Sequence, residues 1–405
     1  MLLCFLAPVF FLQASLSPTT QVNTAPVDSD STVFSSYNSR QDQFLLTWWG
    51  DDMVSSYIYG AVYNANGALA VSTLDLFGNG YNPVSDIASC YNSHANQYFL
   101  SWSEYNVSPS PGPAFAILAA DGSVVEGVTP ISTLAPGGDV LSCYNSLTHQ
   151  YFVTWGTGSG PTYPLYFAIL NEDGTIFKSA TGIPPISGGE SNNPNLFCSY
   201  NPKTNEYLVS WSGDDFTVYI AIYDASGTAV KTATAISPAG QGYTAVSSCV
   251  NSSNNQYLLS WIDTGSNSYF LILSKDGDPL YGPTVIPGFL GKINYPLCCS
   301  YNSGSDSYVL TSVTNANQSQ FAVLSSRGAV IVEPTLIGNP SGLTTLNNAY
   351  NSSGARTWIT WSATDSSTVR NGYFAIYSPL VPIQSIPTST CFPPVQPNRP
   401  TKTLF

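Results

Sequence analysis

The feature that most constrains the fold is a repeat of about fifty residues that the chain contains seven times. Its most regular position, here called the anchor, is Tyr37, Tyr91, Tyr144, Tyr200, Val250, Tyr301 or Tyr350. Asn follows every anchor, and eleven residues after the anchor stands Trp48, Trp102, Trp155, Trp211, Trp261, Ser312 or Trp361. Repeats of this length form solenoids or propellers, so they limit the architecture before any local motif does.

Each copy predicts four antiparallel strands. In the second copy a first strand ends at Tyr91, and a second strand runs over 98–102. A third strand carries Phe-Ala-Ile-Leu over 115–118, and a turn at Asp121-Gly122 leads to a fourth strand over 123–131. Gly supplies the positive φ that tight hairpin turns need. Tandem four-stranded antiparallel units are the blades of propellers.

The chain ends predict that the array closes into a ring. A single four-stranded sheet must pack on its neighbours, and an open array would need polar caps that the sequence lacks. The seventh copy has no Gly turn after Tyr377, whereas Gln21–Pro26 resembles a displaced fourth strand. We therefore predict an all-β, seven-bladed β-propeller with four-stranded antiparallel blades and an N-terminal strand in the last blade. Ile383–Ile386 is the alternative for that place.

The N-terminal segment predicts export. Residues 1–17 carry no charge and Leu2–Leu12 is almost entirely apolar, which suits a signal peptide cleaved after Ala14. The alternatives are a misplaced start or a short membrane anchor. The predicted organisation is a signal peptide at 1–17, a propeller at 18–386 and a Pro-rich tail at 387–405. We expect a secreted or cell-envelope protein, without a transmembrane span and monomeric.

The repeat also resembles a known group of proteins. The stretch Tyr200–Trp211, with Tyr-Asn-Pro followed by Glu-Tyr-Leu-Val-Ser-Trp, resembles repeats of secreted bacterial β-propeller proteins, most of which have no assigned activity. The resemblance covers about Val33 to Tyr377 and implies a propeller and export, but no catalytic residue. The paired Gly of kelch repeats, the Trp-Asp ending of WD repeats and the sialidase Ser-x-Asp-x-Gly-x-x-Trp box are absent.

Charge predicts the kind of partner. The chain has 24 Asp+Glu against 11 Lys+Arg, which disfavours nucleic acid. Acidic residues fall on the loops of one predicted face: Asp51, Asp52, Glu104, Asp214, Asp215, Asp263, Asp365, Asp86 and Asp139. This face could bind a protein or glycan partner of cationic character, or hold weak Ca²⁺, although no Asp-x-Asp-x-Asp-Gly loop is present. The alternative is an acidic rim that serves solubility. No other cofactor or metal is expected.

Catalytic signals are weak. The only two histidines, His94 and His149, follow anchors on the opposite face, where we expect solvent exposure. Asp86 and Asp139 stand five residues before neighbouring anchors, at the mouth of the predicted tunnel. They are the only pair we would test as glycosidase carboxylates, and the alternative is that they cap the loops leading into the inner strands.

Trp and Cys have structural and functional interpretations. The Trp series could form a sugar-stacking platform, but packing between blades is the favoured interpretation. Cys90, Cys143 and Cys249 directly precede an anchor, and Cys198 and Cys299 stand one residue earlier. Equivalent positions in adjacent blades should lie too far apart for disulfides, so we expect buried, unpaired thiols. Metal binding by these thiols is an alternative, without Cys-x-x-Cys spacing to support it.

Together these features favour an exported, non-enzymatic binding module that presents its acidic loop face to a protein or glycan. Two alternatives remain open. The first is a carbohydrate-active enzyme, a glycosidase or lyase, using carboxylates at the tunnel mouth. The second is a structural scaffold of the cell envelope.

Overall fold

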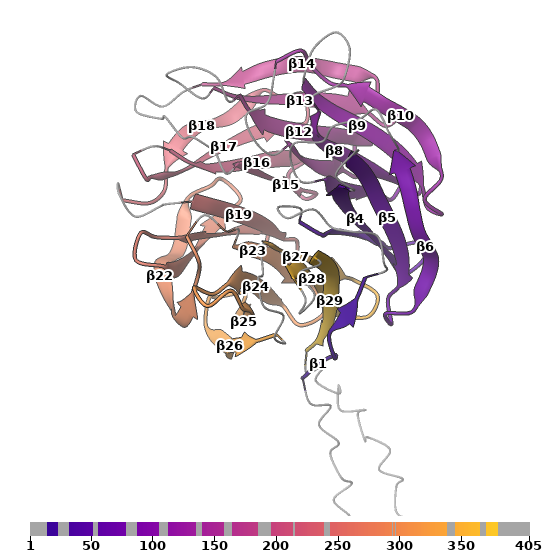
Figure 1. The fold of residues 1–405 in the computed structure, drawn as a ribbon. Coiled ribbons are helices and arrows are strands. Elements are labelled where there is room, and N and C mark those ends of the chain that lie inside the picture. Colours follow the sequence, from indigo (N-terminus) through magenta and orange to yellow (C-terminus); the bar gives the residue numbers. More distant parts are fainter. Residues whose placement is uncertain are drawn as a thin grey trace, which may run out of the picture.

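The computed structural model describes residues 14–22, 32–51, 56–77, 87–104, 112–134, 140–157, 164–184, 196–213, 215–238, 244–293, 295, 297–337, 345–364 and 370–379. Within these ranges every element is a β-strand, and the strands form seven antiparallel sheets around one axis (Figure 1). The predicted seven-bladed β-propeller is confirmed. The described ranges contain no helix long and apolar enough to cross a membrane.

Six blades each contain four consecutive strands, with the first strand innermost (Figure 1). Blade 1 comprises β3 (Phe34–Asn38), β4 (Gln43–Asp51), β5 (Ser56–Asn64) and β6 (Leu69–Phe77). Blade 2 comprises β7 (Ala88–Asn92), β8 (Gln97–Glu104), β9 (Gly112–Ala119) and β10 (Val124–Pro130). Blade 3 comprises β11 (Val140–Asn145), β12 (Gln150–Gly156), β13 (Leu165–Asn171) and β14 (Ile176–Ile183).

The remaining blades follow the same order. Blade 4 comprises β15 (Leu196–Asn201), β16 (Glu206–Ser212), β17 (Val218–Asp224) and β18 (Ala229–Ala235). Blade 5 comprises β19 (Thr244–Asn251), β20 (Gln256–Ile262), β21 (Asn267–Ser274) and β22 (Pro279–Leu290). Blade 6 comprises β23 (Cys298–Asn302), β24 (Ser307–Val313), β25 (Ser319–Ser325) and β26 (Val330–Leu336). Blade 7 comprises β27 (Thr345–Asn351), β28 (Arg356–Thr364) and β29 (Arg370–Ser378), with β1 (Ser15–Leu16) and β2 (Thr20–Gln21) at its outer edge.

The N-terminal segment completes blade 7, as the displaced-strand argument predicted. Both β1 and β2 pair with β29, through Leu16 opposite Tyr377 and Gln21 opposite Tyr373. The pairing with β29 begins earlier in the sequence than expected, at Ser15. β1 lies within residues 1–17, which the sequence analysis assigned to a signal peptide. The alternative strand at 383–386, the predicted tail at 387–405 and most of 1–17 lie outside the described residues.

The hydrophobic core lies between the blades. Seven buried clusters are each shared by two neighbouring blades, and one of them joins blade 7 to blade 1. At that junction Phe44 of β4 stacks on Trp358 of β28, with ring centroids 4.4 Å apart. Each sheet therefore buries its faces only when both of its neighbours are present, which is why the ring closes.

The Trp series belongs to this core, so the sugar-platform interpretation is wrong. The six Trp side chains at the repeat position are 6% exposed or less. Five of them stack on a Tyr of the neighbouring third strand, as Trp155 does on Tyr166 with centroids 5.9 Å apart. In blade 6 the same cross-strand position is polar, and Gln320 donates a 2.8 Å hydrogen bond to Ser312.

The Asn that follows each anchor makes two kinds of hydrogen bond. Asn145, for example, is fully buried, and its Oδ1 accepts from the backbone N–H of Leu147 and Thr148 at 2.9 and 3.0 Å. This caps the turn between β11 and β12. Its Nδ2 donates at 2.9 Å to Asn205 Oδ1 and at 2.9 Å to Tyr207 Oη, both in blade 4. One side chain thus shapes its own turn and holds the next blade.

The hydrogen bonds from these Asn side chains to the following blade, here called the Asn relay, run around most of the ring. Bonds from Nδ2 to the following blade are made by six of the seven residues, namely Asn38, Asn92, Asn145, Asn201, Asn302 and Asn351. The last of these closes the circle, because Asn351 of blade 7 donates to Asp42 of blade 1 at 2.9 Å. Asp42 lies in the left-handed region, with φ 54°, like the residue five positions after every other anchor. Asn and Asp tolerate that conformation better than most residues.

Replacing Asn351 with Ala is expected to lower the free energy of unfolding by about 2 kcal/mol. The change removes a buried group that caps its turn and leaves the Asp42 carboxylate without one of its donors. Urea unfolding followed by tryptophan fluorescence measures the effect. The matched control is Asn254→Ala, at an exposed position in the equivalent turn of blade 5, which should change stability by less than about 0.5 kcal/mol. Equal effects of the two substitutions would contradict the role of the relay.

The same junction predicts a loss of stability in acid. Partial burial raises the pKa of Asp42, but hydrogen bonds from Ser353, Tyr37 and Asn351 outweigh it and leave the pKa below its ordinary value. A carboxyl with a lowered folded-state pKa stabilises the fold above the unfolded value of roughly 4, and this contribution is lost as the pH falls through the folded value.

Asp42→Asn should remove that pH-dependent contribution and keep the acceptor, since Asn already occupies the same position in three other copies. Unfolding free energies at pH 6 and pH 3 are compared for both proteins. We expect a smaller difference between the two pH values in Asp42→Asn than in the original chain. An identical difference would show that Asp42 does not contribute.

Candidate functional site

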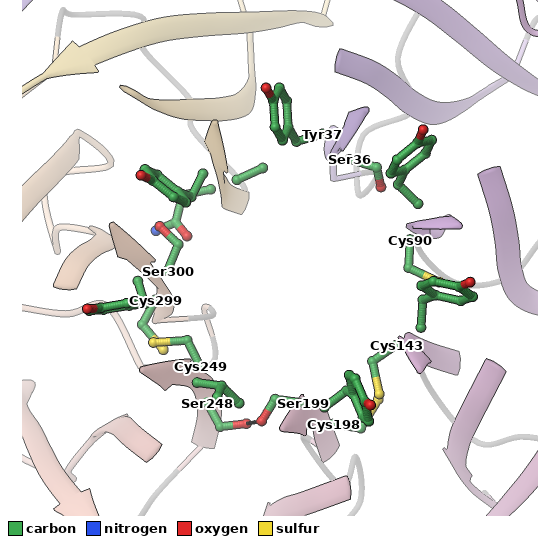
Figure 2. Close-up of a pocket in the computed structure, with 18 of the residues that line it drawn as sticks. Ser36, Tyr37, Cys90, Cys143, Cys198, Ser199, Ser248, Cys249, Cys299 and Ser300 are labelled. Atoms are coloured by element: carbon green, nitrogen blue, oxygen red, sulfur yellow. Dashed lines mark hydrogen bonds between the residues drawn. The ribbon is translucent and has the colours of Figure 1, made fainter. Parts of the chain in front are cut away.

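The seven inner strands surround a central channel of about 450 Å³ (Figure 2). Its wall is formed by the anchors and by the one or two residues before each of them. The lining comprises Ser36, Tyr37, Cys90, Tyr91, Ser142, Cys143, Tyr144, Cys198, Ser199, Tyr200, Ser248, Cys249, Val250, Cys299, Ser300, Tyr301, Asn348, Ala349 and Tyr350. Among the residues that the structure describes, this lining contains no ionised side chain at neutral pH.

Six of the anchors form a ring of aromatic side chains, here called the tyrosine rim: Tyr37, Tyr91, Tyr144, Tyr200, Tyr301 and Tyr350. They stand near the end of each inner strand, beside the turn to the second strand. The Tyr37 hydroxyl points away from the channel axis (Figure 2) and donates to Asp42 Oδ1 at 2.9 Å. Tyr91 and Tyr200 bond in the same way to Asn96 and Asn205. The hydroxyls are thus held by the turns, and the ring surfaces line the channel.

The rim is uncharged at neutral pH because phenols ionise only near pH 10, and burial moves the pKa of several of them further up. Burial raises the pKa of Tyr144 to about 12, and it also raises the pKa of Tyr37, Tyr91 and Tyr200 above the ordinary value. The sequence identified these Tyr only as anchors of the repeat. Their hydroxyl partners depend on the fold of each turn, although the Asn or Asp that stands five residues after four of the six Tyr is a signal that could have found them.

Below the rim the channel wall consists of small hydroxyl and thiol side chains. Ser199 and Ser248 are hydrogen-bonded across blades 4 and 5 at 3.0 Å. The six described cysteines are free thiols, as the sequence suggested, but Cys90 and Cys143 are only half-buried. From the sequence, only equivalent positions of adjacent blades were compared. It was not considered that a Cys directly before one anchor can meet a Cys two residues before the next anchor. Cys143 faces Cys198, and Cys249 faces Cys299, with their sulfur atoms side by side (Figure 2).

The acidic face is only partly described. The side chains of Asp51, Asp52, Asp86, Asp139, Asp214 and Asp365 lie outside the described residues. The pair considered for glycoside hydrolysis, Asp86 and Asp139, is therefore not tested by the described residues.

The three described acidic residues are bonded within their own blades. Glu104 is 1% exposed and accepts a 3.0 Å hydrogen bond from the Trp102 indole. The sequence placed its carboxylate on an exposed face, and the structure shows it buried instead. Asp215 accepts from the Tyr219 hydroxyl at 2.7 Å. Asp263 accepts from the backbone N–H of Gly265 and Asn267, both at 2.8 Å. These carboxylates stabilise the ends of their strands.

The two histidines make a contact that the sequence analysis did not predict. Solvent exposure was predicted for each, and the His94 side chain is 56% exposed. The rings nevertheless stack on one another, with centroids 3.8 Å apart, although 55 residues of sequence separate them. Glu172 bonds to His94 at 2.7 Å. The sequence could not show this contact, because it joins two blades.

The fold resembles that of several solved propellers. No protein-family model and no curated protein matches the chain. The lectin BP39L from Burkholderia pseudomallei superposes with a TM-score of 0.63 at 16% identity, over 92% of this chain and 99% of the lectin. The NanB sialidase from Streptococcus pneumoniae gives 0.51 at 9% identity, over 89% of this chain and 70% of the sialidase.

A third structure is the β-propeller domain of the Trilobed protease from Pyrococcus furiosus, with a TM-score of 0.50 at 8% identity, over 85% of this chain and 95% of that domain. At these identities the likeness shows the fold alone.

The channel thiols are expected to resist alkylation. Desolvation by the channel walls raises the pKa of Cys90 to about 12, and desolvation together with the facing thiol raises the pKa of Cys143 and Cys249. Since the thiolate is the nucleophile, iodoacetamide at pH 7.5 should label these thiols at least about a hundredfold more slowly in the folded protein than in urea. Mass spectrometry of timed samples measures the rates. Similar rates in both states would contradict the raised pKa of the thiols in the folded channel.

Proposed function

We propose that this protein is an exported binding module that takes an uncharged segment of a glycan at the tyrosine rim. The observation that carries the proposal is an aromatic ring of six Tyr above a channel whose described lining bears no ionised group. The channel volume of about 450 Å³ lies within the range of small-ligand sites, roughly 300–1,000 Å³.

The chemistry of the site suits a sugar. Aromatic rings present an apolar surface to the C–H face of a pyranose, whereas hydroxyl and amide groups bond to its hydroxyls. The rim supplies the first, and the hydroxyls of Ser36 and Ser199 below it supply the second. A charged ligand would find no counter-charge in the described lining and would lose its hydration without compensation.

The similarity to a lectin supports a binding role, since that protein has the same fold over nearly the whole of both chains. The other interpretations have less support from the described residues. Glu104, Asp215 and Asp263 are bonded within their own blades, which argues against the acidic loops as the main binding surface. The described channel wall offers no carboxylate pair for glycoside hydrolysis, and Asp86 and Asp139 lie outside the described residues.

Removing rim rings is expected to weaken glycan binding at least tenfold. The test uses Tyr91→Val and Tyr200→Val, because Val250 shows that the fold accepts Val at an anchor. A stacking ring contributes about 0.5–1.5 kcal/mol beyond its buried area, so losing the ring and its area reduces affinity by roughly an order of magnitude. A neutral-oligosaccharide array identifies a ligand, and titration calorimetry gives its affinity for each variant.

Two further variants separate binding from folding. Tyr200→Phe keeps the ring and loses only a hydroxyl that faces Asn205, so its affinity should remain within about threefold of the original. Tyr281→Val replaces an exposed Tyr on β22, far from the inner strands in the strand order, and should not change binding. An array without any neutral glycan signal, or full affinity in both anchor variants, would refute the proposal.

A further inference from the structure

The histidines of this chain occur as a single pair in contact. The sequence has two His among 405 residues, and their rings stack with centroids 3.8 Å apart and planes inclined by 22°. His94 lies in the turn between β7 and β8 of blade 2, and His149 in the turn between β11 and β12 of blade 3. Both turns are on the face that carries the tyrosine rim.

A carboxylate completes the group. Glu172, in the turn between β13 and β14, places Oε2 at 2.7 Å from His94 Nδ1. Potential ligand atoms of His94, His149 and Glu172 all lie within 4.8 Å of one another. Metal–ligand distances of roughly 2.0–2.2 Å in a tetrahedral site place neighbouring donors about 3.4 Å apart, so the three ligand atoms have to move together by about 1 Å to share one ion.

His149 is held in place by its own turn. It occupies the left-handed position five residues after the anchor, with φ 58°. Tyr144 Oη lies 3.1 Å from His149 Nδ1, in the same arrangement that Tyr91 makes with Asn96. The phenol can donate to Nδ1 or accept from it, and in the second case Nε2 has a free lone pair. A hydrogen bond to the second ring nitrogen is the usual orienting contact of a metal-bound His.

His94 and Glu172 stand at positions where no other copy has His, Cys, Asp or Glu, and His149 is the only His at its position, where two other copies have Asp. The residue equivalent to His149 is Asn or Asp in five of the other copies, and the residue equivalent to His94 is Ser in two. The residue equivalent to Glu172 is Ala in three. Because the turns fold alike in the other blades without these side chains, turn geometry does not require them.

A groove adjoins the group. It has a volume of about 620 Å³, lies between blades 2 and 3, and is bordered by Glu172 together with Ile117, Val125 and Glu126. The exposed His94 ring can turn on its side-chain bonds toward an ion at this edge.

We propose that His94, His149 and Glu172 form a binding site for a divalent transition-metal ion, with Zn²⁺ as the best-suited probe. Two imidazoles and one carboxylate are donors that Zn²⁺ accepts, and three protein ligands leave a fourth position for water or for an oxygen of a ligand in the groove. Ca²⁺ prefers six to eight oxygen donors and is not expected here. The site joins blades 2 and 3, and it does not depend on glycan binding at the rim.

Titration calorimetry with ZnCl₂ on the full chain, first treated with EDTA, tests the site. The variants are taken from the repeat itself: His149→Asn, His94→Ser and Glu172→Ala each introduce a residue that the same turn already carries in another blade. We expect one Zn²⁺ per chain in the original protein and at least a tenfold weaker affinity in every variant. Glu126→Ala, which removes a carboxylate of the groove outside the group, should bind Zn²⁺ normally.

Thermal unfolding provides a second measurement that does not use the same signal. Zn²⁺ should raise the midpoint of the original chain and of Glu126→Ala, because it binds only the folded arrangement of two blades, and it should not raise the midpoint of His149→Asn. Binding that persists in all three variants would place the ion elsewhere, for example at the channel thiols, and would overturn the proposal. Absence of binding at 100 µM Zn²⁺ would also overturn it. Neither result would bear on glycan binding by the rim.

Discussion

The fold depends on one side chain in each repeat, the Asn that follows the anchor. Its oxygen caps the turn between the first two strands, and in six of the seven copies its nitrogen donates to the next blade. A buried amide with all of its partners adds rigidity, whereas one without them would cost stability, so the turn and its neighbour are specified together. The relay ends where it began, with Asn351 bonded to Asp42 across the junction of blades 7 and 1.

The relay also positions the channel mouth. The residue that receives the bond from the preceding blade is, in several copies, the same residue that holds the anchor hydroxyl, as Asn205 holds Tyr200 and accepts from Asn145. In these copies the Tyr ring is therefore held by the turn of its own blade and, through that turn, by the preceding blade. A rigid aromatic rim on a closed ring would lose little conformational entropy on binding the glycan proposed above.

Much of the architecture could be predicted from the sequence, and less of the site. Seven copies with a regular Trp and Gly turns were enough to predict blade number, strand order and the burial of residues such as Trp155. The N-terminal strand was placed in the correct blade, although its contact begins earlier, at Ser15. Glu104 was wrongly expected at the surface, because the sequence could not show that its carboxylate bonds to Trp102.

The sequence by itself determined the periodic features: the number of blades, the inner position of the anchors, the buried Trp and the turn residues. These follow from local patterns that recur in all or most of the seven copies. Only the tertiary structure decided the contacts between blades, including the pairing of Cys143 with Cys198, the stacking of His94 on His149 and the bond that closes the ring. The physical reason is that such contacts depend on the rotation and stagger of one sheet against the next. Side-chain packing in the clusters between blades sets that stagger, and no single repeat contains it.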